Sequence, residues 1–176
     1  METALDLAFW ITAASILVLL FCSGFFSGSE TALTAATRGK LRSMADKGSG
    51  GAESALKLKE DNERLIGGIL LGNNLANILA TSLATAMFTR LLGEGGVAAA
   101  TLVMTLMVLI FAEVLPKTYA ITDPERAAAR AAPLIGLVVT LLSPAVATVR
   151  LIVRGVLRIF GLHIQPGDQM LSVREE

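Results

Sequence analysis

The sequence predicts an all-α membrane protein with three transmembrane helices and a pair of cytoplasmic-side juxtamembrane helices. Of its 176 residues, 53% are hydrophobic, and the mean hydropathy is +0.65, as is typical of an integral membrane protein. Three apolar runs, at residues 5–26, 65–88 and 97–112, reach or approach the length that crosses about 30 Å of hydrocarbon. The distribution of charge supports the same number of crossings.

The basic residues predict an orientation for these three spans. Every Lys and Arg except Arg90 lies in one of two segments, between the first two runs or after the third. Three crossings place both segments on one side of the membrane, and basic loops favour the cytoplasm. We therefore expect a protein of the inner (plasma) membrane with its N-terminus outside, its C-terminus inside and its basic residues near inner-leaflet lipids. The net charge is zero, so we expect no nucleic-acid partner.

The first run predicts a helix that carries both small and polar residues near its end. It is too long for a signal peptide and has no basic residue before it. Gly24 and Gly28 form a GxxxG pair, which favours close packing against another helix. Ser23, Ser27 and Glu30 are spaced as i, i+4 and i+7, which places them in one stripe of the helix. Packing alone does not explain a serine stripe that ends in a carboxylate.

Residues 38–64 predict helical extensions on the cytoplasmic side. Basic and acidic residues alternate there, and glycines at 48, 50 and 51 mark a flexible turn. We assign these extensions, together with the three spans, to a core at residues 1–132.

The second run contains adjacent asparagines within an apolar stretch. Asn73 and Asn74 point about 100° apart on a helix, so one helix contact cannot satisfy both amides. Hydrogen bonds between helices are one interpretation. The other is that one amide faces a polar cavity or an ion. We also expect an irregular turn here, which would free carbonyls such as that of Leu70 to act as ligands.

The third run ends in an acidic residue and a proline. Glu113 follows an uncharged stretch, and a carboxylate near the bilayer centre costs on the order of 3 kcal/mol, so it indicates a functional site. Pro116 has no N–H, which is expected to leave the carbonyl of Ala112 without its helical partner. The alternative for Glu113 is a simple helix-end salt bridge with Lys117 at i+4.

A fourth apolar stretch, residues 133–149, is long enough for a minimal span. A crossing there would place the arginines at 150, 154 and 158 outside the cell. We therefore predict a juxtamembrane belt at residues 133–162, made of two short helices that turn near Ser143 and Pro144, with the arginines reaching the headgroups. An ordinary fourth span is the alternative. Residues 163–176 are expected to form a short polar tail.

The three spans together offer hydroxyls, amide oxygens, carbonyls and carboxylates. Such hard oxygen ligands suit Mg²⁺, Ca²⁺ or Na⁺. Cys22 and His163 are the only residues of their types, whereas zinc and copper sites draw on clusters of thiolate and imidazole. The residues alone leave open whether the ion is monovalent or divalent.

Three motifs, SGSETALTA, GNNLANILATSLAT and AEVLPKTYA, occur in order along the spans and resemble the CorC/cyclin M (CNNM) transmembrane domain. The resemblance covers nearly the whole chain. It implies a homodimer with a juxtamembrane belt that exports Mg²⁺ in exchange for Na⁺. It also implies cytosolic CBS-pair domains that bind ATP, which are absent from this sequence. Carried over by motif, the implied ion-site residues are Ser23, Ser27, Asn74 and Glu113, with Asn73 and Glu30 nearby.

The expected function is therefore secondary active transport by alternating access. A passive Mg²⁺ channel, or a Mg²⁺ sensor that regulates another transporter, is the main alternative, and flux against a gradient distinguishes them. We do not expect an enzyme, because Ser27 and Glu113 lack a nearby histidine and no HExxH or GxSxG motif occurs. An interaction scaffold would explain the glycine pairs but leaves Glu113 without a role.

Overall fold

A computed structural model describes residues 7–159, so the predicted tail at residues 163–176 lies outside the described residues. Within residues 7–159 every element is helical, in agreement with the predicted fold class. In chain order the elements are α1 (Leu7–Ala35), α2 (Arg38–Asp46), α3 (Gly50–Glu60), α4 (Asn62–Leu92), η2 (Gly93–Gly95), α5 (Gly96–Met107), η3 (Val108–Val114), α6 (Leu115–Thr122) and α7 (Pro124–Ile159).

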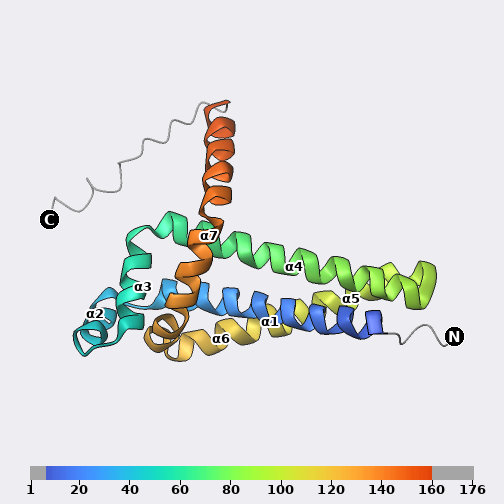
Figure 1. The fold of residues 1–176 in the computed structure, drawn as a ribbon, viewed down its shortest axis with the longest axis horizontal. Coiled ribbons are helices and arrows are strands. Elements are labelled where there is room, and N and C mark those ends of the chain that lie inside the picture. Colours follow the sequence, from blue (N-terminus) through green and yellow to red (C-terminus); the bar gives the residue numbers. More distant parts are fainter. Residues whose placement is uncertain (1–6, 160–176) are drawn as a thin grey trace.

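Three long legs run side by side along the length of the molecule (Figure 1). They are α1, α4, and the continuous stretch α5–η3–α6. By length and composition, residues 7–35, 62–122 and 124–157 could each cross a membrane. The second of these contains the reversal at η2, where Gly93 has a φ of 63°, so it supplies two antiparallel legs. These legs match the three predicted spans, and the chain is a multi-pass membrane protein.

Helices α2 and α3 form a cap at one end of the legs (Figure 1). They join at Gly48, whose φ of 92° suits glycine, and the Ser49 hydroxyl accepts a hydrogen bond from the Ala52 N–H at the start of α3. A Cβ at Gly51 would overlap the Ala129 carbonyl, so this glycine allows α3 to lie directly against α7. The helices expected at residues 38–64 are therefore present.

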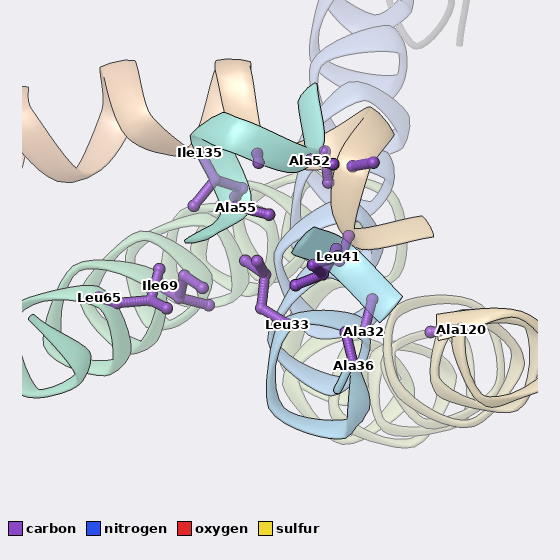
Figure 2. Close-up of a cluster of buried hydrophobic side chains, with 14 of the residues drawn as sticks. Ala32, Leu33, Ala36, Leu41, Ala52, Ala55, Leu65, Ile69, Ala120 and Ile135 are labelled. Carbon is purple, nitrogen blue, oxygen red and sulfur yellow. The ribbon is translucent and has the colours of Figure 1, made fainter. Parts of the chain in front are cut away.

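A buried apolar cluster holds this capped end together (Figure 2). We call it the cap core. Its largest members are Leu33 of α1, Leu41 of α2, Ile69 of α4 and Ile135 of α7, all fully buried or nearly so. Because each side chain comes from a different helix, the cluster fixes how α1, α2, α4 and α7 meet.

Lys59 strengthens the same end by capping α1. Its ammonium group donates to the carbonyls of Leu33 and Ala36 at 2.5 and 2.8 Å. Those carbonyls lie at the end of α1, where the helix has no further N–H to offer them. Arg38 in turn donates to the Lys59 carbonyl at 2.7 Å. Burial lowers the pKa of Lys59, and the nearby charge of Arg38 lowers it further.

Helix α7 differs from the predicted pair of short helices. It is one helix that continues through Pro133 and Pro144, and it lies across the legs rather than alongside them (Figure 1). A proline removes one helical hydrogen bond, yet packing on both sides can carry the helix through. Here Ile135 and Val139 are buried, and Val139 contacts Gly68 of α4. The proline pattern alone wrongly predicted a break.

The start of α7 is fastened to the cap by Glu125. This carboxylate is buried, with 6% of the residue exposed. One of its oxygens accepts hydrogen bonds from the Thr37 N–H and hydroxyl at 3.3 and 3.1 Å, and it pairs with Lys40 at 3.4 Å. The connection between α1 and α2 is thereby tied to the first turn of α7.

Candidate cation site between the three legs

The glycines of α1 bring the third leg close to the serine stripe. A Cβ at Gly24 would lie 3.0 Å from the Phe111 carbonyl oxygen, and one at Gly28 would lie 3.3 Å from Pro116. Both distances are tighter than ordinary contacts, so a larger residue at either position would push the third leg away by a few tenths of an ångström. The packing interpretation of this GxxxG pair is therefore correct.

A π-helical segment carries Glu113. The segment η3, Val108–Val114, widens the turn, and the Leu115 N–H that follows it donates to the carbonyl of Ile110, five residues back. From the sequence, Pro116 is expected to free a single carbonyl, that of Ala112. The chain instead accommodates the proline at the start of α6 with a wide turn ahead of it. Such turns recur at functional sites in helices.

The carboxylate of Glu113 faces polar groups from both other legs. One oxygen accepts from the Ser27 hydroxyl at 3.3 Å, and the other accepts from the Asn73 amide at 3.4 Å. Ser23 donates to the Asn73 amide oxygen at 2.5 Å. Both serines are completely buried and Asn73 is 8% exposed. The three spans thus meet in a connected group of oxygen and amide side chains, which we call the oxygen cluster.

Asn77 extends the oxygen cluster by one turn of α4. Its amide nitrogen donates to the Asn73 oxygen at 3.4 Å. Its own oxygen is buried without a hydrogen-bond partner among the described residues. Asn77 is not among the site residues predicted from the sequence. Its i+4 spacing from Asn73 was the available signal, because that spacing puts both on one face.

Lys117 shares the carboxylate with the oxygen cluster. Its ammonium lies 2.7 Å from the Glu113 oxygen that also accepts from Ser27. The lysine side chain is 43% exposed and the glutamate side chain 29%. Glu30 lies close enough to act on the charge of Lys117. Glu113 is therefore both a salt-bridge partner of Lys117 and a member of the polar site, so both interpretations apply.

Two of the predicted ion-site residues lie elsewhere. Asn74 is exposed, because it points about 100° away from Asn73, which takes the inward direction. Leu70 is 50% exposed, and α4 is unbroken from Asn62 to Leu92, so no irregular turn frees its carbonyl. The asparagines satisfy their amides by facing other side chains or the exterior, which leaves the helical backbone intact.

The chemistry of the oxygen cluster is that of a hard-cation site with low formal charge. Among the described residues no group of three His, Cys, Asp or Glu side chains gathers in one place. A cation here would draw on hydroxyl and amide oxygens and on a single central carboxylate. Lys117 balances that carboxylate, so the group as it stands is electrically neutral.

Comparison with known sequences connects this arrangement to a family. The family described as the cyclin M transmembrane N-terminal domain matches residues 14–176. An Escherichia coli protein named UPF0053 inner membrane protein YfjD is 42% identical over 140 residues, which cover 80% of this chain and 33% of the relative. A UPF0053 protein of Haemophilus influenzae is 34% identical over 160 residues, covering 91% and 38%. The chain thus spans between about a third and two fifths of these relatives' length.

Proposed function

The chain belongs to the family of cyclin M transmembrane N-terminal domains, and on that premise we propose that it is the membrane part of a Na⁺-coupled Mg²⁺ exporter. Mg²⁺ is the transported ion and Na⁺ the coupling ion. In this proposal the N-terminus is outside, the C-terminus is cytoplasmic, and the protein works as a homodimer by alternating access. In relatives of greater length, cytosolic CBS-pair domains would follow this part.

The observation that carries the proposal is that the Glu113 carboxylate and the buried, unpaired amide oxygen of Asn77 belong to one cluster, in which Asn73 hydrogen-bonds to both residues. An unpaired buried acceptor costs about 1–3 kcal/mol, and a carboxylate at membrane depth costs more. A cation bound in the oxygen cluster would offset the cost of both groups. Ser23, Ser27 and Asn73 add further oxygens of the kind that Mg²⁺ and Na⁺ accept.

Entry of a cation requires Lys117 to leave the carboxylate. Its ammonium and an incoming ion compete for the same oxygen of Glu113, because both are attracted by one negative charge. Lys117 is partly exposed, and Glu30 offers a second acidic group on the same side. The empty site is thus neutralised by the protein itself, and the loaded site by its ion.

To open the site to one side of the membrane and then the other, the helices would move at their close contacts around the oxygen cluster. Gly24 and Gly28 meet the third leg, and Gly72 of α4 meets the ring of Phe26. Surfaces of small residues allow helices to slide or rock without pulling large side chains apart.

The proposed dimer would use the outward faces of α4 and α5. There the hydroxyls of Thr85, Thr101 and Thr105 donate to carbonyls of their own helices, at 2.7 to 2.8 Å. Their methyl groups are then left for packing against a second copy, as small residues pack in membranes.

The test is transport by the purified chain in sealed vesicles. Vesicles loaded with Mg²⁺ and bathed in an equal Mg²⁺ concentration should show net Mg²⁺ movement only when a Na⁺ gradient is imposed. Glu113→Gln should reduce that flux at least ~100-fold, because it removes the central charge. Asn74→Ala is the matched control on α4 and should keep wild-type flux. Movement that only follows the Mg²⁺ gradient would indicate a channel, and no movement with intact binding would indicate a sensor.

A further inference from the structure

A long apolar groove runs along the outside of α1, on the face opposite the oxygen cluster's asparagines. It has a cavity volume of about 880 Å³ and lies between α1, the η3–α6 stretch and the start of α7. Its walls are mainly aromatic and aliphatic, and include Phe21, Phe25, Phe111, Leu115 and Tyr119. Several of these side chains are more than half exposed, as Phe21 is at 78%.

One end of the groove is basic. Arg126 and Arg130 both line it, and they lie one turn apart on α7, so they share a face. Arg126 pairs with Asp123 at 3.4 Å, whereas within residues 7–159 Arg130 makes no ion pair. Asp123 is the acidic residue of the lining, which leaves a net charge of about +1 at this end.

The length of the groove matches half a bilayer. Along α1 its lining runs from Leu17 to Ala32, which a helix extends over about 22 Å. One leaflet supplies about 15 Å of hydrocarbon. The apolar part therefore accommodates a whole acyl chain, and the arginine end reaches beyond it to the depth of the headgroup.

We propose that this groove binds one anionic phospholipid, with its acyl chains along α1 and its headgroup phosphate on Arg126 and Arg130. A net negative headgroup complements the net positive end, and basic pockets between membrane helices favour such lipids. The amine of a zwitterionic headgroup would gain nothing from the arginines. This inference concerns the face of α1 away from Asn73 and does not depend on the transported ion.

A lipid in the groove would affect the oxygen cluster, because the groove shares residues with the helix contact beside that cluster. Gly24, Gly28 and Pro116 line the groove on one side, and the same residues form the close contact between α1 and the third leg. A lipid held there lies against the helices that must move in the proposed cycle.

The experiment measures lipid retained by the purified chain in detergent, by native mass spectrometry and by thermal stability. Phosphatidylglycerol and phosphatidylcholine with identical acyl chains are added separately, and inorganic phosphate serves as a third addition. We expect retention of phosphatidylglycerol at least about tenfold above phosphatidylcholine, from two arginines near one headgroup, and no stabilisation by phosphate.

Variants locate the site. The double change Arg126→Gln and Arg130→Gln should bring phosphatidylglycerol down to the level of phosphatidylcholine. The control changes two exposed basic residues of the cap, Arg42→Gln and Lys47→Gln, and should retain the tenfold preference. Leu115→Trp fills the groove and should reduce retention of both lipids.

Three outcomes would overturn the proposal. Equal retention of the two lipids by the wild-type chain is one, and equal loss in the arginine and control pairs is another. The third is that Leu115→Trp leaves lipid retention unchanged but dissociates a dimer, which would assign the groove to a second copy of the chain.

Discussion

The two apolar clusters of this molecule differ in which elements supply their side chains. The cap core, at the end formed by α2, α3 and α7, joins the legs to these three helices, with the large side chains Leu33, Leu41 and Ile135 among its alanines. The cluster farther along the legs, which we call the leg core, draws its buried side chains from the three legs alone: Ile16, Leu20, Ala80, Ala84, Met104 and Ala112. The oxygen cluster lies between the two.

We expect the surroundings of the two regions to differ as well. Outside the hydrocarbon, burial of large apolar side chains drives helices together. Between lipid chains that driving force is absent, so helices associate through close packing of small residues and through hydrogen bonds. We infer that the cap core is the rigid end of the protein and that the leg core is the end where helices can shift.

Matched leucine-to-alanine substitutions in the two cores should give the largest effect, a change in the free energy of unfolding. Leu41→Ala empties a fully buried position in the cap core and should lower the free energy of unfolding by about 3 kcal/mol. Leu20→Ala in the leg core should cost about half as much, because lipid and neighbouring small residues can close the space. Denaturant unfolding in detergent measures both. Equal losses would show that the two cores are equally rigid.

Substitutions at two glycines, one of them a control, test the close contact beside the oxygen cluster. Gly24→Ala places a methyl 3.0 Å from the Phe111 carbonyl oxygen and 3.1 Å from Pro116, so it should destabilise the fold by about 2 kcal/mol. Gly39→Ala in α2 meets nothing within 4 Å and should be neutral or slightly stabilising. If Gly24→Ala matched its control, the third leg would not depend on that contact.

Removal of the competing ammonium should tighten cation binding. Lys117→Met frees one Glu113 oxygen and should raise affinity for Mg²⁺ about tenfold, or about 1.4 kcal/mol, by isothermal titration. Na⁺ added as a competitor should weaken the Mg²⁺ signal in both proteins. Unchanged or weaker Mg²⁺ binding by the variant would show that the lysine does not occupy the cation's place.

The smallest expected effect concerns the α1 cap. Lys59→Met removes two hydrogen bonds to the end of α1 and should lower stability by about 1 kcal/mol. Lys57→Met is the control, since its pair with Glu53 is exposed on both sides and should matter little. A comparison of thermal unfolding for the two variants is sufficient. Equal curves would mean that the cap core holds α1 without the lysine.

Much of the site could be predicted because its residue types are costly in lipid. An acidic residue and buried amides in apolar runs need partners, so Glu113, Ser27 and Asn73 were expected to matter, and the structure brings them together. Which asparagine side chains point inward could not be predicted from the sequence. A helix shows which residues share a face, but only its neighbours decide which face is inward, and they favour Asn73 and Asn77 over Asn74.

The sequence by itself determined the helical class, the three legs and the polar interruptions, because hydrophobic length, charge and glycine spacing act locally along the chain. The tertiary structure alone decided the rest. It carries α7 through two prolines across the legs, since contacts with α3 and α4 compensate for the missing hydrogen bonds. It also places a π-helical turn ahead of Pro116, and Glu113 in that turn faces Ser27 and Asn73. Both depend on neighbours distant in sequence, which no local pattern records.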